Sequence, residues 1–409
     1  MAYLCSLIWR FQTMTTFANY NFAGKRALIR VDFNVPLDKA SHAVTDDTRI
    51  RAAARTIQHI LGQGGSVVLM SHLGRPKGAD EALSMRHVQG AVEAVLNHKV
   101  IFAGDCIGDQ AREITATMQA GDVVLLDNLR FYAEEEAGDE FFAGQLAEHG
   151  DVYVNDAFGT AHRAHASTAI IARFFPHDKL FGYLMEAEID SIDRILTAPE
   201  KPVTAIIGGA KVSDKLLIVE NLLNTADHII IGGGMAYTFF KAMGQEIGNS
   251  LCEVDRIDTC KSIIERAEEA GVKLHLPVDS VIANAFSADA DTQVCASGEI
   301  PSGWMGLDIG PAARAEFAEV IAKSRIVLWN GPMGVFEMAP FAQGTFAMAN
   351  ALVDATKNGA FTLVGGGDSV AAINKSGLAE SVSYVSTGGG AMLEALEGKV
   401  LPGIAAVRN

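Results

Sequence analysis

The sequence predicts an α/β protein made of two doubly wound parallel-sheet (Rossmann-like) domains joined by a helix. Short apolar runs rich in β-branched residues alternate with longer amphipathic stretches along nearly the whole chain. Near-continuous apolar strands that alternate with helices are typical of parallel sheets covered on both faces. The runs end in polar or glycine-rich turns, and 409 residues suffice for two or three domains, each with its own core.

Eleven apolar runs predict strands. Those of the first half are residues 27–33, 66–72, 100–104, 122–128 and 152–158. Those of the second half are residues 203–209, 228–234, 273–280, 325–331, 361–367 and 382–390. Helical patterns such as residues 46–63 and 341–358 lie between most of them, because their apolar residues recur at helical spacing.

A third helical pattern, at residues 183–197, marks the domain boundary, since a proline-containing break and a fresh series of strands follow it. We predict an N-terminal extension at residues 1–16 and an N-terminal domain at residues 17–182. The interdomain helix and the C-terminal domain are expected at residues 183–390, and a C-terminal segment at residues 391–409. Met14 is an alternative start, in which case residues 1–13 add nothing to the fold.

Composition and charge argue against several classes of protein. A formal net charge of −16 disfavours binding to nucleic acid or to an anionic membrane. No apolar run approaches the roughly 18 residues of a membrane span. The five cysteines are scattered and form no CxxC pair, which argues against a disulfide framework or a zinc site. We therefore expect a protein of a reducing compartment, the cytoplasm.

The first half collects basic residues where its strands end, and ligands of open parallel sheets bind at the carboxyl ends of strands. With Arg49 from the first helix, the set is Arg30, Arg49, His72, Arg75, Arg130, His162, Arg163 and His165. Each arginine alone could pair with a nearby carboxylate. Together, in an acidic chain, their planar forks favour a site for a small, heavily charged anion. Asp32 and Asn34 either cap a turn or bind substrate hydroxyls.

The second half ends its strands in glycine-rich turns. These turns are GGAKVSDK at 208–215, GGGMA at 232–236, GGGDS at 365–369 and STGGGA at 386–391. Each could be only a tight turn, but several such turns after strands suggest backbone nests around a polyphosphate. Lys211 and Lys215 stand at the expected start of a helix, which favours anions, so they are either solvated or face a docked anion.

Further residues of the second half extend this interpretation. Asp368 is either the N-cap of the next helix or a ligand for Mg²⁺, which takes one or two carboxylates plus phosphate oxygens. Pro332, Val335 and Glu337 could line an adenosine slot, whereas Trp329 is expected in the core. Neither GxGxxG nor GxxxxGK[ST] occurs in these turns.

The ordered set RVDFNVP, SHLGRP, DNLRF, NDAFGTAHRAH, GGAKVSDK, WNGPMGVFE, GGGDS and STGGGA closely resembles the phosphoglycerate kinase family, from about residue 17 to the C-terminus. The resemblance implies reversible phosphoryl transfer between 1,3-bisphosphoglycerate and ADP, giving 3-phosphoglycerate and ATP, with Mg²⁺ as cofactor. It also implies a monomer whose two hinge-linked domains close over small-molecule substrates, and a C-terminal segment that returns to the N-terminal domain.

The resemblance also assigns roles to residues. It implies that 3-phosphoglycerate is held by Asp32, Asn34, Arg49, His72, Arg75, Arg130, His162 and Arg163. It implies a nucleotide site at Gly208, Ala210, Lys211, Lys215, Gly234, Leu307, Asn330, Pro332, Val335, Glu337, Gly366, Gly367, Asp368 and Ser369, with Asp368 on Mg²⁺. The transferring group would contact Arg49, Lys211 and the backbone of Gly366, Gly388 and Gly389. Departures are mild: Asp127 replaces the usual Glu, and Ser369 the commoner Thr.

A general base is not expected, because the carboxylate or phosphate oxygen that attacks carries no proton at neutral pH. Catalysis would then come from alignment and charge neutralisation. Two other classes of protein fit the sequence less well. A dinucleotide-dependent oxidoreductase would need a GxGxxG turn, and a non-catalytic nucleotide-binding protein would leave the arginine set without a purpose.

Overall fold

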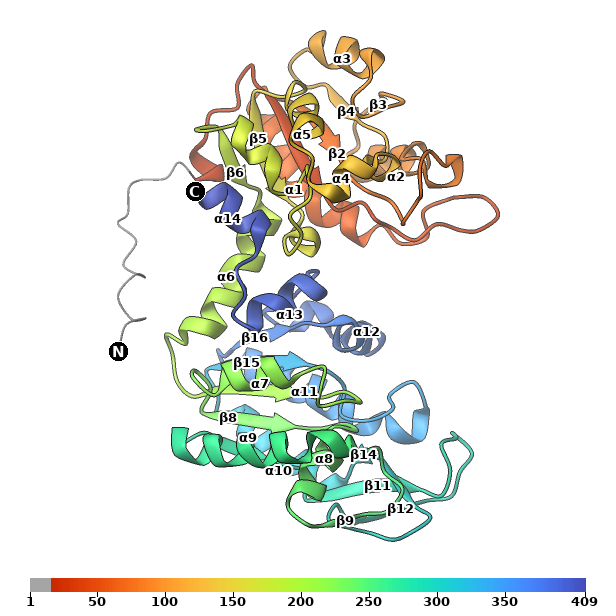
Figure 1. The fold of residues 1–409 in the computed structure, drawn as a ribbon, viewed down its shortest axis with the longest axis vertical. Coiled ribbons are helices and arrows are strands. Elements are labelled where there is room, and N and C mark those ends of the chain that lie inside the picture. The colour runs from red at the N-terminus through yellow and green to blue at the C-terminus, as the bar shows by residue number, and fades with distance from the viewer. Residues whose placement is uncertain (1–15) are drawn as a thin grey trace. The chain divides into compact units, whose positions relative to one another are not determined.

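The computed structural model describes residues 16–409, which form two compact units (Figure 1). The first unit contains the described residues up to Ala187 together with Leu401–Asn409, and the second contains Glu188–Val400. Each unit is built on a six-stranded parallel sheet, which confirms the predicted fold class. Most of the expected N-terminal extension, including Met14, lies outside the described residues.

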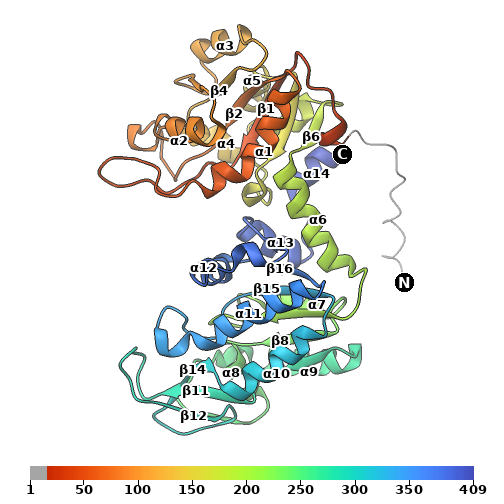
Figure 2. The ribbon, with the colours of Figure 1, turned by 180° about the vertical axis from the view of Figure 1, so that it is seen from behind.

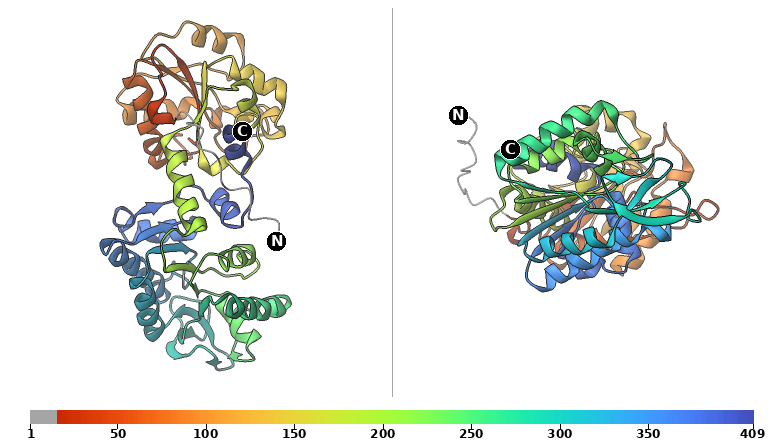
Figure 3. Two further views of the ribbon diagram at one scale, coloured as in Figure 1. Left: turned by 90° about the vertical axis from the view of Figure 1, so that its left-hand side faces the viewer. Right: turned by 90° about the horizontal axis from the view of Figure 1, so that it is seen from below.

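The sheet of the first unit has the strand order β3-β4-β2-β1-β5-β6, and all its pairs are parallel. Its strands are β1 (Arg26–Val31), β2 (Ser66–Met70), β3 (Ile101–Phe102), β4 (Val123–Leu125), β5 (Val152–Asp156) and β6 (Lys179–Phe181). Its helices are α1 (Thr48–Gly62), α2 (Arg86–Leu96), α3 (Asp109–Ala116), α4 (Ala133–Ala137), α5 (Glu140–Ala147) and α14 (Pro402–Arg408). The C-terminus belongs to this unit (Figure 3).

Alternation along each strand gives this sheet two apolar faces, because successive side chains of a strand point to opposite sides. Ile29 of β1 packs in one core cluster with α1 and α2, whereas its neighbour Leu28 packs in another with α3, α5 and α14. Helix α1 buries Ile50, Ile57 and Ile60, which share one face at helical spacing. The strands are therefore buried on both sides, as their near-continuous apolar sequences predict.

The sheet of the second unit has the order β10-β8-β7-β15-β16-β17, also with parallel pairs only. Its strands are β7 (Val203–Ile207), β8 (His228–Ile231), β10 (Lys273–His275), β15 (Ile326–Asn330), β16 (Phe361–Val364) and β17 (Tyr384–Val385). Its helices are α7 (Leu216–Leu222), α8 (Ala236–Ala242), α9 (Ile257–Ala270), α10 (Pro311–Ala322), α11 (Gln343–Lys357), α12 (Gly367–Lys375) and α13 (Gly390–Leu396). Helices α10, α11 and α12, labelled in Figure 2, share a core with one face of the sheet. Trp329 is fully buried in this core.

Helix α6 (Tyr183–Thr197) has the bounds that the sequence predicted, and it begins in the first unit and ends in the second. Helix α13 belongs to the second unit, where Asn221 Nδ2 donates to the carbonyl of Leu396 at 2.8 Å. Helix α14 belongs to the first unit, where Lys179 Nζ donates to the carbonyl of Ala406 at 3.0 Å.

The second unit also contains two smaller sheets that were not predicted from the sequence. Strands β12 (Thr292–Ala296), β11 (Asp279–Ala283) and β14 (Met305–Ile309) form a three-stranded antiparallel sheet. The short strands β13 (Glu299–Ile300) and β9 (Glu246–Ile247) form a parallel pair. The single strand expected at residues 273–280 was wrong, because it is divided around Pro277 between two sheets. Proline cannot donate to a ladder and therefore ends the first piece.

Candidate active site

Three turns of the second unit interlock at the carboxyl ends of β7, β8 and β15. The amide of Gly209 donates to the carbonyl of Pro332 at 3.0 Å, and the amide of Gly233 donates to the carbonyl of Met333 at 3.1 Å. Gly331 has a φ of +101°, and a Cβ at this position would overlap the carbonyl of Gly208. Glycine is required there because the backbones approach too closely for a side chain.

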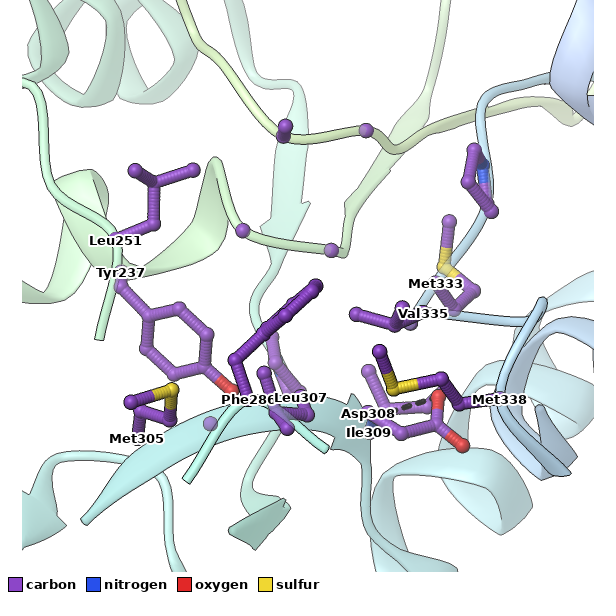
Figure 4. Close-up of a pocket in the computed structure, with 18 of the residues that line it drawn as sticks. Tyr237, Leu251, Phe286, Met305, Leu307, Asp308, Ile309, Met333, Val335 and Met338 are labelled. Carbon is purple, nitrogen blue, oxygen red and sulfur yellow. Dashed lines mark hydrogen bonds between the residues drawn. The ribbon is translucent and has the colours of Figure 1, made fainter. Parts of the chain in front are cut away.

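A pocket of about 700 Å³ opens beside these turns (Figure 4). That volume lies within the range of small-molecule sites. Seven of the residues predicted for the nucleotide site line it: Ala210, Gly234, Leu307, Pro332, Val335, Glu337 and Asp368. The other seven are absent from its lining: Gly208, Lys211, Lys215, Asn330, Gly366, Gly367 and Ser369.

Apolar side chains form much of the pocket wall, and the sequence analysis did not find them. Tyr237, Leu251, Phe286, Met305 and Met338 all line it (Figure 4). They come from α8, from β14 and from loops, so they are scattered through the sequence and share no motif. Only the unpredicted antiparallel sheet brings Met305 to the pocket.

Of the two lysines of GGAKVSDK, Lys215 stands at the start of a helix as predicted, because it is the N-cap of α7, which begins at Leu216. The expectation was wrong for Lys211. Lys211 lies exposed in the preceding loop. Glu253 holds this loop by accepting from the amide of Ser213 at 3.0 Å and from its hydroxyl at 2.6 Å. The two glycines let the chain turn away from β7 before the helix starts, which leaves Lys211 in solvent.

Lys215 is half-buried and donates to Asn330 Oδ1, while Asn330 Nδ2 donates to the carbonyl of Gly365 at 2.8 Å. Burial lowers the pKa of Lys215, and the nearby Asp214 and Asp368 carboxylates oppose that shift. Asn330 therefore ties the lysine to the turn after β16. A Cβ on Gly366 would approach Asn330 Nδ2 to 2.6 Å.

Asp368 lies in the first turn of α12, but it is not the N-cap, because that position belongs to Gly366. Its carboxylate is exposed at the edge of the pocket and has no hydrogen-bond or ion-pair partner among residues 16–409. The next residue, Ser369, is buried and accepts from the amide of Gly331 at 2.5 Å. A carboxylate without a protein partner at a pocket is a suitable oxygen ligand for Mg²⁺.

The STGGGA turn is held by a buried carboxylate. Glu188 accepts from Ser386 Oγ at 2.7 Å, from the amide of Thr387 at 2.7 Å and from Thr387 Oγ1 at 2.8 Å. The amide of Gly388 donates to Ser386 Oγ at 3.0 Å, so this predicted donor already has an acceptor. Gly389 has a φ of +49° and precedes α13.

Most of the predicted basic set lies in contact within the first unit. Arg49 Nη1 lies 2.8 Å from Asp32 Oδ2, and His72 Nδ1 lies 3.9 Å from Asp32 Oδ1. Gly74 bridges Asn34 and Arg130, because its amide donates to Asn34 Oδ1 and its carbonyl accepts from Arg130 Nη1, each at 2.8 Å.

The remaining members of the set differ in exposure. Arg163 Nε lies 3.3 Å from His162 Nε2, whereas Arg75 is exposed and makes no hydrogen bond within the described chain. Arg75 is therefore the predicted residue that the structure does not tie to the others.

The arginines of the set act electrostatically on two histidines. Burial lowers the pKa of His72 well below its ordinary value, and Arg30, Arg130, Arg49 and Arg163 lower it further. Burial lowers the pKa of His165 to about 4, helped by Arg130, Arg163 and Arg30. Both imidazoles are therefore neutral at pH 7, and the positive charge of the cluster comes from the arginines.

Internal ion pairs neutralise this cluster only in part. Arg49 pairs with Asp32, and Arg130 Nε lies 3.1 Å from Glu136 Oε1 without the alignment of a hydrogen bond. Across residues 16–409, Arg75 and Arg163 have no carboxylate within 4.0 Å. The cluster therefore keeps a positive charge that an anionic ligand can neutralise.

Two parallel-sheet units, one with an arginine cluster and the other with a pocket lined by glycine-rich turns, are the arrangement expected of a two-domain phosphotransferase. The sequence profile of the phosphoglycerate kinase family matches residues 17–399, and the chain belongs to that family.

Individual relatives agree with this assignment. The chain is 53% identical to "Phosphoglycerate kinase" of Porphyromonas gingivalis, over 96% of this chain and 100% of that one. It is 49% identical to "Phosphoglycerate kinase 3, cytosolic" of Arabidopsis thaliana, over 97% and 98%. The structure of phosphoglycerate kinase from Coxiella burnetii superposes with a TM-score of 0.88 at 40% identity, covering 96% of this chain and 98% of that chain.

Membership establishes the reaction. The enzyme is a kinase that transfers a phosphoryl group reversibly between 1,3-bisphosphoglycerate and ADP, a step of glycolysis. The oxidoreductase and the non-catalytic alternatives are thereby rejected. Within the described part of the chain, no helix is both long and apolar enough to span a bilayer.

Proposed function

We propose that the arginine cluster of the first unit binds 3-phosphoglycerate and that the pocket of the second unit binds ADP or ATP. The observation that carries this division is the difference in chemistry between the two places. One offers several guanidinium groups with uncompensated charge, which suit a small trianion. The other offers an apolar wall with a few polar groups, which suits a nucleoside.

Within this division, Arg49, Lys211 and the amides of Gly366 and Gly389 are the groups proposed to contact the phosphoryl group in flight. None of these groups needs to transfer a proton, because the attacking oxygen carries none. Their task is to align the reactants for in-line transfer and to neutralise charge on the transferring oxygens. Because donor and acceptor are assigned to different units, this proposal requires domain closure during turnover.

Mg²⁺ fits the second unit through Asp368. The carboxylate lies at the pocket edge without a protein partner, and Mg²⁺ is bound in such sites by one or two carboxylates together with phosphate oxygens. When bound, the ion would neutralise negative charge on the nucleotide phosphates. Lys215, half-buried near Asp368, would add a second cation to the same phosphates.

We further propose that the enzyme works as a cytoplasmic monomer. Four cysteines of the described chain, Cys106, Cys252, Cys260 and Cys295, are free thiols, which suits a reducing compartment. A relative from Arabidopsis thaliana is named as cytosolic, in agreement with this location.

Titration calorimetry with each ligand alone tests the division. Val335→Trp places a bulky ring in the pocket and should reduce MgADP affinity by at least about tenfold, while 3-phosphoglycerate affinity stays at the wild-type value. Arg163→Met should reduce 3-phosphoglycerate affinity and leave MgADP affinity at the wild-type value, because a hydrogen bond to a charged group contributes about 1.5–3 kcal/mol. The division is wrong if either variant weakens the ligand assigned to the other unit.

A further inference from the structure

A chain of buried polar side chains runs beneath the arginine cluster of the first unit. It contains Glu135 of α4, Ser167, Arg30 of β1 and His72, each no more than 5% exposed. The hydroxyl of Ser167 donates to Glu135 Oε1 at 2.6 Å, and its amide donates to Oε2 at 2.9 Å. Arg30 Nε donates to Ser167 Oγ at 3.0 Å, and Arg30 Nη2 lies 3.2 Å from His72 Nδ1.

The hydrogen-bond donors among these side chains determine the tautomer of His72. A guanidinium group has only N–H donors, so His72 Nδ1 must be the acceptor in its contact with Arg30. A neutral imidazole accepts at one nitrogen and carries its proton on the other. The proton of His72 is therefore on Nε2.

The opposite tautomer would need an acceptor at Nδ1, and Asp32 is the candidate. Its Oδ1 lies 3.9 Å from Nδ1, which is too long for a hydrogen bond, and its Oδ2 is already engaged by Arg49 at 2.8 Å. A doubly protonated ring is disfavoured by burial and by the surrounding arginines, which lower the pKa of His72. Both alternatives to the Nε2–H form are therefore disfavoured.

Glu135 offsets the cost of burying the Arg30 guanidinium. A buried charge without a partner is costly, whereas one that is paired and hydrogen-bonded is retained. The carboxylate reaches Arg30 through Ser167 Oγ, which accepts from Arg30 and donates to Glu135. Burial raises the pKa of Glu135, and the charge of Arg30 is the largest effect that opposes this shift. The charge of Arg30 thus favours the ionised form of Glu135.

We propose that Glu135, Ser167 and Arg30 are positioning residues that hold His72 as a neutral imidazole with its proton on Nε2, so that it donates a hydrogen bond to an oxygen of the bound acceptor. This proposal rests on the proposed binding of 3-phosphoglycerate by the first unit. A neutral donor orients the ligand without adding another positive charge to a crowded cluster.

Nuclear magnetic resonance tests the tautomer directly. In uniformly ¹⁵N-labelled enzyme at pH 7, a multiple-bond ¹H–¹⁵N spectrum should show His72 with an unprotonated Nδ1 and a protonated Nε2, the ring being assigned by its disappearance in His72→Gln. Protonation at Nδ1, or at both nitrogens, would overturn the proposal.

Variants test the positioning role. Arg30→Met should convert His72 to a mixture of tautomers and weaken 3-phosphoglycerate binding by roughly tenfold or more, with MgADP affinity unchanged, since a charged hydrogen bond is lost. Ser167→Ala is a smaller change that serves as a second variant if Arg30→Met does not fold. It should also shift the ring resonances of His72. Arg26→Met is the matched control, because Arg26 lies on the same strand but pairs with Asp151 at 3.0 Å.

The outcomes separate this proposal from the binding assignment. Wild-type enzyme that does not bind 3-phosphoglycerate to the first unit would reject the assignment itself. If it binds, and Arg30→Met and Ser167→Ala both leave the tautomer and the affinity unchanged, the positioning role alone is rejected.

Discussion

The Lys211→Ala enzyme is expected to turn over MgATP and 3-phosphoglycerate about 10²–10³ times more slowly than the wild type. Removing one preorganised group that neutralises charge in a transition state typically has an effect of that size. Lys211 lies exposed in the loop after β7, so the substitution removes no buried contact. The melting temperature should therefore stay unchanged while the turnover number falls.

Steady-state kinetics measure this effect, and Lys241→Ala provides a matched control. Lys241 is also an exposed lysine of the second unit, in the last turn of α8, and it does not line the pocket. Its removal changes the net charge equally and should leave turnover unaltered. Near-wild-type turnover by Lys211→Ala would remove this lysine from the proposed catalytic groups.

Gly331→Ala is expected to destabilise the second unit and to abolish nucleotide binding under ordinary assay conditions. The positive φ of this residue alone costs a side chain about 1–3 kcal/mol. The added Cβ would also overlap the carbonyl of Gly208, and relief of such overpacking costs about 1–3 kcal/mol more. Because the turns after β7 and β15 must separate, the pocket that they line should be distorted.

Chemical denaturation and MgADP titration together measure this prediction. Gly359→Ala is the control, since Gly359 has a φ of +89° but open space where an added Cβ would lie. Gly359→Ala should lose only the stability that a side chain costs at positive φ, and it should bind MgADP normally. Equal destabilisation of the two variants, or unimpaired MgADP binding by Gly331→Ala, would show that the close approach of the two turns has no importance.

The parallel sheets could be predicted from the sequence because each strand is buried on both faces and is therefore apolar throughout. Strand β7 shows this most simply, since all five of its residues are buried. The antiparallel sheet could not be predicted in the same way. Strand β12 is largely exposed and lacks an apolar pattern, while β10 and β11 follow each other so closely that Pro277 was the sole separating signal.

The candidate site was predictable to a different degree in each unit. Most of the basic set of the first unit follows strand ends, so topology alone gathers residues such as Arg130 and Arg163 near His72. In the second unit the glycine turns were visible in the sequence, but the apolar wall was not. Phe286 and Met305 reach the pocket through loops and a sheet whose pairing depends on tertiary structure.

The exact start of helix α7 also could not be predicted from the sequence. Two glycines followed by lysines resemble a phosphate-binding helix start, yet the chain makes a loop first, held by Glu253 from a segment 40 residues away. A long-range contact of this kind leaves no local signal. It determines where Lys211 lies, and with it the proposed catalytic arrangement.

The central claim is that the pocket and glycine-rich turns of the second unit act together with the arginine cluster of the first unit in moving a phosphoryl group. A coupled assay of ADP formation by the wild-type enzyme tests it most directly, with MgATP, 3-phosphoglycerate, or both. ADP is expected only when both substrates are present. ADP formed at the same rate without 3-phosphoglycerate, or no ADP with both, would contradict it.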